Sequence, residues 1–374
     1  MQFFCYNYIG DNMLKTSLKV LNKFVENGYQ AYIVGGFVRD YVLGIESKDV
    51  DIATNATPKQ IMEIFDTSAL PKEEYGAVTL YVKNNRFEIT TFRKEIKYLN
   101  HRKPVEIKYI DDLYEDLKRR DFIMNTLCMD KDGNIIDLLN GTKDIENKII
   151  NTVGDSNNKF REDSLRILRA IRFATILNFE LSSEIKNAIT INKESLKNLS
   201  YSRKKEELDK IFSSKNARYG VDLLLELGLE ESLEIYNLKD IKLNSDILGI
   251  WASLSIGKGY QFTTNERAII KNIKEVVNNS ISELSLYKYG LYVNQVAADI
   301  IGIDRSLVTK TYEALPITSR KSIEISSQDI MNILNSKPGP YFREIYNDLE
   351  IKILKGELEN NKESITQYIL NNYS

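Results

Sequence analysis

The sequence has little cysteine and histidine, and it carries no excess of either charge. Cys5 and Cys128 are the two cysteines among 374 residues, which excludes a disulfide framework and the spacing of a zinc site. The formal net charge of -2 gives no global basic excess that would indicate a nucleic-acid partner. The single histidine, His101, stands in a polar stretch, so the sequence lacks the His-Asp cluster of a metal-dependent phosphohydrolase.

Long hydrophobic runs are also missing. The first ten residues have neither a basic segment nor a long apolar core, so we expect no signal peptide and no membrane span. The reducing cytoplasm is therefore the expected compartment. At roughly 150 residues per domain, the chain is long enough for two or three domains.

Strand patterns come first along the chain, and helix patterns follow. Before about residue 155, apolar spacing predicts helices over 14–27, 38–43 and 58–65 and strands over 31–34, 50–53, 78–82 and 87–89. The polar stretch RKEIKYLNHRKP (93–104) has no apolar periodicity and is predicted to be a mobile loop. From residue 162 the pattern is helical, with breaks expected near Asn178, Gly220, Gly228, Gly257, Gly302 and 337–340. This order predicts an α+β fold, with a mixed-sheet head before an all-helical remainder.

The stretch VGGFVRDYVLGIESKDVDIAT, from Val34 to Thr54, joins a glycine turn to two aspartates. Residues i and i+2 of a strand share a face, so Asp49 and Asp51 point the same way. Two such carboxylates bind hard cations, and Mg²⁺ completes its coordination with substrate phosphates. Gly36 allows the backbone to approach a phosphate chain, and Arg39 can reach a triphosphate oxygen. The combination favours nucleotidyl transfer over a solvated Asp-x-Asp beside a structural turn.

Two further stretches bring charged residues toward this site. If the strand of Glu88 neighbours that of Asp51, Glu88 is a third carboxylate that assists the metals or the attacking hydroxyl; otherwise it is a surface residue. In KRRDFIMNTL (118–127), Asp121 is expected to cap the N-terminus of the following helix. Arg119 and Arg120 cannot both be buried without partners, so one of them is expected to contact the triphosphate or the nucleotide.

The stretch FREDSLRILRAIRFATIL (160–177) is predicted to be one amphipathic helix. Its polar half carries four residues at a spacing of three: Asp163, Arg166, Arg169 and Arg172. A solvated basic face is the alternative, but the regular spacing favours a nucleotide or polyanion partner. Residues 151–220 contain 14 Lys and Arg against 9 Asp and Glu, a local net charge of +5.

Asp163 and Arg166 are neighbours at i, i+3 and match the edge of a base. An ionised aspartate only accepts hydrogen bonds and an arginine only donates them. Cytosine and adenine both present an amine donor beside ring acceptors, whereas uracil and guanine place a carbonyl there. The pair therefore accepts C and A and rejects U and G, because the wrong base leaves buried polar groups unpaired.

The sequence resembles the class II tRNA nucleotidyltransferases, the CCA-adding enzymes, within the polymerase β superfamily. The matching stretches occur in order over nearly the whole chain: VGGFVRDYVLG, DVDIAT, YGAVTLYV, FEITTFRKEIKY, EDLKRRDFIMNTL, REDSLRILRAIRFA and KPGPYFREIYNDLE. These motifs separate CCA addition only weakly from A addition and from bacterial poly(A) synthesis, so those activities stay as alternatives. An inactive RNA-binding homologue is a third, against which the intact Arg39, Asp49 and Asp51 argue.

The resemblance implies template-independent addition of C, C and A to the 3′ end of tRNA, using CTP and ATP and with Mg²⁺ as cofactor. It implies these roles: triphosphate contact by Gly36 and Arg39, Mg²⁺ binding by Asp49 and Asp51, nucleotide contact by Arg120, base reading by Asp163 and Arg166, and completion of the site by Arg169 and Arg172. It also implies a nucleotidyltransferase head (12–150), a neck (151–220) and a body with tail (221–374), with the tRNA acceptor arm along the helices. We expect a monomer or a homodimer.

The sequence departs from the family at a few positions. Thr126 replaces the usual alanine after Asn125, which is a mild change. Ser202 stands where relatives commonly carry glutamate before Arg203, which puts a supporting contact of the neck in doubt. Enzymes of this family that add only CC typically lack part of the segment at 93–104; because it is present here, we expect A addition to be retained.

Overall fold

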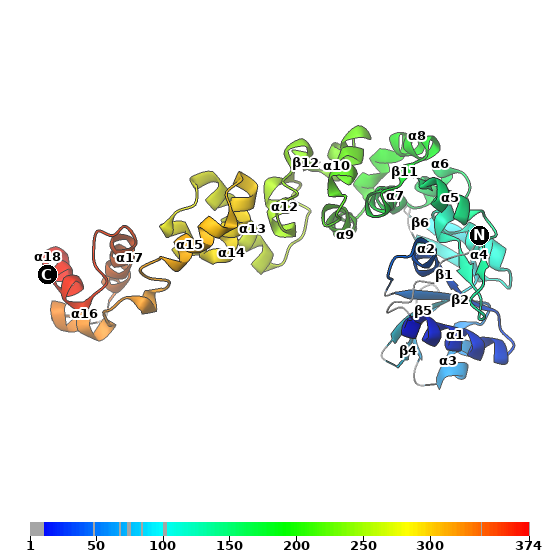
Figure 1. Ribbon diagram of the computed structural model, residues 1–374, viewed down its shortest axis with the longest axis horizontal. Coiled ribbons are helices and arrows are strands. Elements are labelled where there is room, and N and C mark those ends of the chain that lie inside the picture. Colours follow the sequence, from blue (N-terminus) through cyan, green and yellow to red (C-terminus); the bar gives the residue numbers. More distant parts are fainter. Residues whose placement is uncertain are drawn as a thin grey trace. The chain divides into compact units, whose positions relative to one another are not determined.

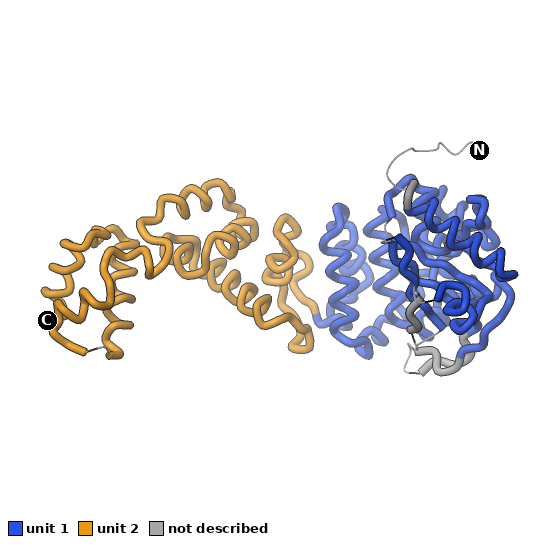
Figure 2. Tube along the Cα trace, turned by 90° about the horizontal axis from the view of Figure 1, so that it is seen from below, with its two compact units in different colours: residues 1–234 blue, residues 235–374 orange. Residues whose placement is uncertain are grey.

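The computed structural model describes residues 11–47, 49–66, 69–72, 76–83, 85–99, 103–337 and 339–373 (Figure 1). The chain forms two compact units, residues 1–234 and 235–374 (Figure 2). The boundary expected at residue 220 falls inside helix α10 (Ala217–Glu226), and the units divide after Glu234.

A seven-stranded mixed sheet forms the centre of the head, in the order β3-β4-β5-β2-β1-β8-β9. β2 and β5 run parallel, and the other neighbouring pairs run antiparallel. The strands of this sheet are β1 (Ala31–Val34), β2 (Val50–Thr54), β3 (Ala69–Lys72), β4 (Ala77–Val82), β5 (Asn85–Thr91), β8 (Cys128–Met129) and β9 (Ile135–Ile136). The mixed-sheet head predicted from the sequence is confirmed.

Short helices connect and cover these strands. They are α1 (Asp11–Glu26), α2 (Gly36–Leu43), α3 (Pro58–Phe65), α4 (Leu113–Lys118) and α5 (Gly141–Asn147). Thr57 caps α3: its side chain accepts from the N–H of Gln60 while the side chain of Gln60 accepts from the N–H of Thr57. Beneath the sheet edge that carries the candidate site, a buried cluster joins strands to α4; it comprises Val34, Ala53, Phe92, Leu113, Leu117 and Cys128.

The prediction of a mobile loop over 93–104 is wrong for most of that segment. β6 (Arg93–Leu99) and β7 (Lys103–Tyr109) pair antiparallel as a separate hairpin, with irregular register near Lys97. Main-chain hydrogen bonds hold such a ribbon, so it needs no alternation of apolar side chains, and periodicity could not reveal it. His101 lies outside the described residues.

The predicted single helix over 160–177 is two helices. α6 (Ser156–Glu162) ends at Asp163, whose backbone is extended (φ -147°, ψ 103°), and α7 (Leu165–Leu177) begins two residues later. The Oδ1 atom of Asp163 accepts a hydrogen bond from the N–H of Leu165 at 3.0 Å. Aspartate competes with the helix for backbone donors in this way, which explains the break.

The rest of the first unit is helical, apart from β10 (Ile149–Ile150) and β11 (Glu180–Leu181), which pair parallel. Its helices are α8 (Ser183–Asn192), α9 (Tyr201–Phe212), α10 and α11 (Glu230–Leu233). Gly220 was expected to break a helix, yet it lies inside α10. A Cβ atom there would approach Oγ1 of Thr175 to 2.3 Å, so this glycine permits close packing of α10 against α7.

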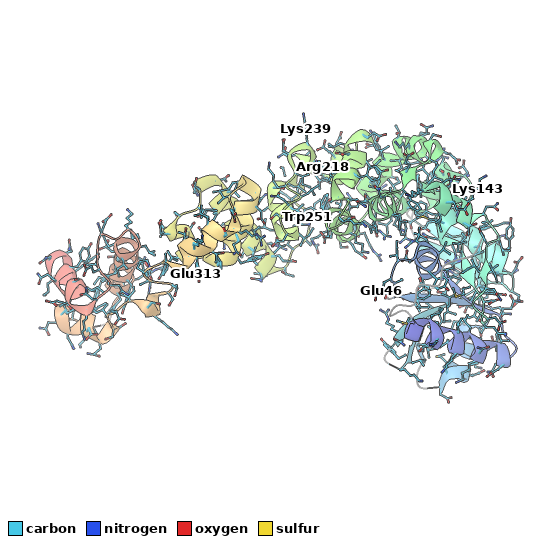
Figure 3. All side chains as sticks on the ribbon, in the orientation of Figure 1. Glu46, Lys143, Arg218, Lys239, Trp251 and Glu313 are labelled. Carbon is cyan, nitrogen blue, oxygen red and sulfur yellow. The ribbon has the colours of Figure 1, made fainter. Side chains whose placement is uncertain are left out.

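The second unit consists of helices with one short strand pair, β12 (Ile235–Tyr236) and β13 (Ser255–Ile256). The helices are α12 (Ile247–Ser253), α13 (Thr264–Asn279), α14 (Glu283–Ile301), α15 (Arg305–Glu313), α16 (Ser327–Leu334), α17 (Tyr341–Leu354) and α18 (Lys362–Tyr373). Trp251 of α12, which is labelled in Figure 3, is fully buried and packs on Tyr260 and Phe262. Across the described parts of both units, we find no helix with the length and apolar character to span a membrane.

Candidate active site

The glycine turn lies where β1 meets α2. Gly35 adopts φ 75° and ψ -133°, a backbone conformation that L side chains rarely adopt. A Cβ atom on Gly35 would stand 3.5 Å from a terminal guanidinium nitrogen of Arg120, so the turn and this arginine are neighbours. Gly36 is the first residue of α2, next to the guanidinium of Arg39.

Asp51 and Glu88 lie directly opposite each other on the parallel pair β2 and β5. The condition set for Glu88 as a third carboxylate is therefore met, because its strand neighbours that of Asp51. Val50 is buried behind Asp49 and Asp51, as strand alternation predicts. Glu88 also forms an ion pair with Arg86 at 3.6 Å.

The pKa of Asp51 is raised, mainly because surrounding protein atoms desolvate the carboxyl group. The charge of Arg120 opposes this shift, whereas the negative charges of Glu88 and Asp49 add to it. The three carboxylates therefore interact electrostatically, and a cation beside them would relieve their repulsion.

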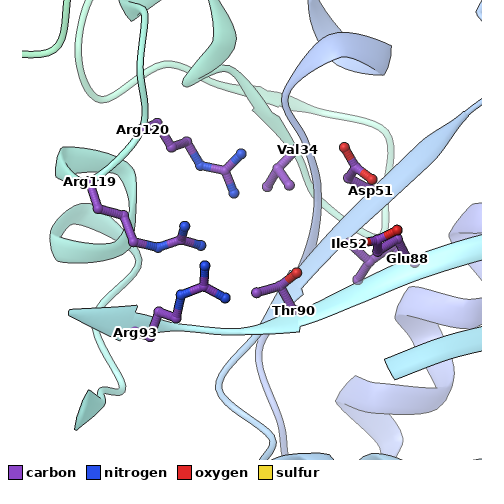
Figure 4. Close-up of a pocket in the computed structure, with 8 residues that line it drawn as sticks. All are labelled: Val34, Asp51, Ile52, Glu88, Thr90, Arg93, Arg119 and Arg120. Atoms are coloured by element: carbon purple, nitrogen blue, oxygen red, sulfur yellow. The ribbon is translucent and has the colours of Figure 1, made fainter. Parts of the chain in front are cut away.

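Two of these carboxylates, Asp51 and Glu88, and three arginines face one open pocket of about 170 Å³, whereas Asp49 is not part of its lining (Figure 4). Its lining comprises Val34, Asp51, Ile52, Glu88, Thr90, Arg93, Arg119 and Arg120. Asp51 and Glu88 lie on one side, and the guanidinium groups of the arginines lie on the other (Figure 4). A triphosphate with a divalent cation has the complementary distribution of charge, with the cation beside the carboxylates and the phosphates beside the arginines.

Arg119 and Arg120 are both half-buried and share a partner. Asp116 of α4 is fully buried and accepts from Nε of Arg119 at 2.8 Å and from a terminal nitrogen of Arg120 at 3.3 Å. Burial alone would raise the pKa of Asp116, but the two arginines lower it below its ordinary value. Both arginines therefore line the pocket, whereas the sequence led us to expect one.

Arg39 lies deeper than the pocket wall. It is buried and donates to Oδ1 of Asp40 at 2.7 and 2.9 Å and to Oδ1 of Asn125 at 2.8 Å. Its guanidinium also lies 5.0 Å from the ring centre of Phe173 in α7. The structure therefore brings Arg39 to the junction of α2 and α7, beside the glycine turn and outside the lining of the described pocket.

Asp121 does not cap a helix as expected. The next helical turn (Ile123–Asn125) begins after Phe122, and Asp121 accepts instead from Nε and a terminal nitrogen of Arg169 at 2.8 and 2.5 Å. Burial would raise the pKa of Asp121, yet the charge and hydrogen bonds of Arg169 lower it to about 2. This ion pair joins the head to the neck over 48 residues of sequence.

The arginines of α7 do not form a solvated face. Arg166 is buried and donates to Glu162 at 2.8 Å, to the carbonyl of Lys159 at 3.1 Å and to the carbonyl of Arg119 at 3.4 Å. Arg172 pairs with the buried Glu207 at 2.5 Å. The contact between Arg166 and the carbonyl of Arg119 places the neck directly beside the arginines that line the pocket.

The donor chemistry of the site fits a hard divalent cation. Asp51 of β2 and Asp49, which directly precedes β2, offer carboxylate oxygens, and the pocket beside Asp51 leaves space for phosphate oxygens to complete the shell. In the described part of the chain, no three His, Cys, Asp or Glu side chains lie close enough to hold a metal unaided. The residues thus fit an ion that is bound together with its substrate.

Sequence reasoning missed Arg93, Thr90 and Asp116. Thr90 lies two residues after Glu88 on β5, so strand periodicity placed it on the same face. Arg93 and Asp116 gave no local signal, because they reach the site only through the packing of α4 against β6.

Three parts of the chain match models of protein families. Residues 31–151 match the poly A polymerase head domain, residues 178–234 match the "Probable RNA and SrmB- binding site of polymerase A", and residues 258–369 match domain 2 of tRNA nucleotidyltransferase. The CCA-adding enzyme of Ligilactobacillus salivarius is 34% identical, over 94% of this chain and 95% of that protein. The CCA-adding enzyme of Bacillus subtilis is 32% identical, over 94% and 97%.

Solved structures give the same result. The crystal structure of the Bacillus stearothermophilus CCA-adding enzyme in complex with CTP matches with a TM-score of 0.84 at 27% identity. The match covers 96% of this chain and 97% of that one, so the similarity includes the helical parts as well as the head.

Proposed function

This chain belongs to the family of CCA-adding enzymes, and we propose that it adds C, C and A to the 3′ end of tRNA without a nucleic-acid template. CTP and ATP are the substrates, and pyrophosphate is released. The observation that carries the proposal is the pocket itself, in which Asp51 and Glu88 face Arg93, Arg119 and Arg120.

We assign the reaction to named groups of this pocket. Asp49 and Asp51 hold Mg²⁺, which when bound stabilises charge on the attacking 3′-oxygen and on the leaving pyrophosphate. The 3′-oxygen attacks the α-phosphorus, and the bond to the pyrophosphate oxygen breaks. Arg119 and Arg120 neutralise the phosphates, and Glu88 assists either the metals or the attacking hydroxyl.

The glycine turn supports the same end of the nucleotide. Gly36 lies at the start of α2, where backbone N–H groups favour an anion. Arg39 adds positive charge behind this turn. Contact between Arg39 and the triphosphate requires its guanidinium to share donors with Asp40 and Asn125, which hold it in the described structure.

Base choice falls to the neck. Asp163 and Arg166 read the amine-bearing edge of C and A, and Arg166 already contacts the carbonyl of Arg119 beside the pocket. Arg169 and Arg172 complete this region by joining it to Asp121 and Glu207. The partner is the acceptor arm and 3′ end of tRNA, which lies along the helices, and the protein works as a monomer or a homodimer.

A nucleotide-addition ladder tests this function. Three tRNAs, lacking CCA, lacking only the final A, or complete, are each incubated with one labelled NTP and Mg²⁺. We expect two C additions to the first, one A addition to the second, and none to the third. A addition alone would indicate an A-adding enzyme, long A tracts a poly(A) polymerase, and no incorporation an inactive homologue. The full-length match to CCA-adding enzymes favours the first outcome.

A further inference from the structure

The three arginines of the pocket come from different segments but share one wall. Arg93 begins β6, whereas Arg119 and Arg120 directly follow α4. Their guanidinium groups converge on the same space (Figure 4). Three like charges this close repel one another, so some group must fix them in place.

Asp116 contacts all three of these residues. Its Oδ1 accepts from the backbone N–H of Arg93 at 3.1 Å and from Nε of Arg119 at 2.8 Å, and its Oδ2 accepts from Arg120 at 3.3 Å. The side chain is fully buried, so it cannot itself touch a nucleotide.

Arg120 is only partly satisfied by this contact. Among the described residues, its buried Nε atom has no hydrogen-bond partner, and its ion pair with Asp116 is long at 3.3 Å. The guanidinium lies beside Gly35, where the absence of a side chain leaves room. A buried donor without a partner destabilises the protein, and a phosphate oxygen in the pocket would remove part of that cost.

We propose that Asp116 is the positioning residue for the triphosphate: it orients Arg119 and Arg120 toward the phosphates and fixes the start of the β6–β7 hairpin beside them. The proposal rests on the proposed function and adds a residue to it. The base is read elsewhere, in the neck, so Asp116 acts on the part that all nucleotides share. Loss of the Asp116 carboxylate must therefore weaken the binding of CTP and of ATP by the same factor.

The test compares Asp116→Asn with wild type. Asparagine has the same shape, but it offers one oxygen where aspartate offers two, and its amide group repels one of the arginines. We expect KM to rise about 10-fold to 100-fold for CTP on tRNA lacking CCA, and by the same factor for ATP on tRNA lacking A, at about one factor of ten per misplaced phosphate contact. The CTP/UTP preference and the Kd for tRNA should stay unchanged.

Binding of tripolyphosphate, measured by calorimetry without metal, gives a readout that needs no catalysis. It should weaken in Asp116→Asn by the factor seen in KM. Asp116→Glu keeps the charge and should recover part of the loss. Arg119→Met should add little to Asp116→Asn, because both changes remove the same contact.

Asp130→Asn is the matched control. Asp130 accepts three hydrogen bonds in the turn between β8 and β9 and contacts no residue of the pocket lining. We expect a lower Tm for this variant and an unchanged KM. Asp116 is merely structural if Asp116→Asn lowers Tm while KM and tripolyphosphate affinity stay at wild-type values. Unequal changes in KM for CTP and for ATP also overturn the proposal. If the wild-type protein binds tripolyphosphate but incorporates no nucleotide, only the proposed function is overturned.

Discussion

Exchange of Asp163 for asparagine tests base selection with little disturbance of the fold. In the structure, Oδ1 of Asp163 accepts from the N–H of Leu165 and holds the turn between α6 and α7. Asparagine keeps an oxygen for this bond. At the other position it presents an N–H donor where aspartate presented an acceptor, so the pattern offered to the base is reversed.

The size of the effect follows from one hydrogen bond. The variant loses the acceptor for the amine of cytosine and gains a donor for the carbonyl of uracil. A hydrogen bond to a charged group is worth about 1.5–3 kcal/mol. The ratio of kcat/KM for CTP over UTP should therefore fall by about 10-fold to 150-fold.

The assay measures kcat/KM for CTP and UTP on one tRNA that lacks the CCA end. Asp155→Asn is the control: Asp155 caps α6 through one hydrogen bond to Asn158 and lies outside the proposed site, so its ratio should match wild type. An unaltered CTP/UTP ratio in Asp163→Asn would refute the reading of bases by this residue, even if the activity itself stood.

Four further expectations follow from the site and the neck. Asp49→Ala or Asp51→Ala should each abolish incorporation with unchanged Tm, since each removes a metal ligand; more than a few per cent of wild-type activity with Mg²⁺ would contradict the metal assignment. Shortening the segment at 93–104 while keeping Arg93 should leave CC products on a sequencing gel, because the pocket must adjust for the larger purine; equal loss of C and A addition would speak against it. Affinity for tRNA should fall steeply with salt as counterions are released, and a flat dependence would exclude the basic neck as the RNA surface. Asp121→Asn should lower the free energy of unfolding, measured with urea. Breaking a buried ion pair costs roughly 3–5 kcal/mol, and we expect the lower end of this range because Arg169 keeps 34% side-chain exposure. Since the folded pKa of Asp121, about 2, lies below its ordinary value, this difference should be full at neutral pH and shrink as pH falls from about 5 to 2; a difference independent of pH would show that the charge is not its source.

The sequence by itself determined the features that depend on near neighbours in the chain. Strand alternation placed Asp49 and Asp51 on one face with Val50 buried behind them, and the capping residue Thr57 marked the start of α3. Both follow from backbone geometry over a few residues, which needs no knowledge of the rest of the fold. The break at Asp163 shows the limit, because its side chain also satisfies local backbone donors, yet apolar periodicity ran through it unchanged.

Only the tertiary structure decided which distant groups meet. Glu88 opposes Asp51 because β5 pairs parallel with β2, and Arg169 meets Asp121 because α7 packs against the head. The same packing buries Arg166 and leaves Arg169 and Arg172 only partly exposed, so the alternative of a solvated basic face is wrong. A buried charge is stable only beside an opposite charge, and the chain supplies that partner from tens of residues away, where no local pattern can show it.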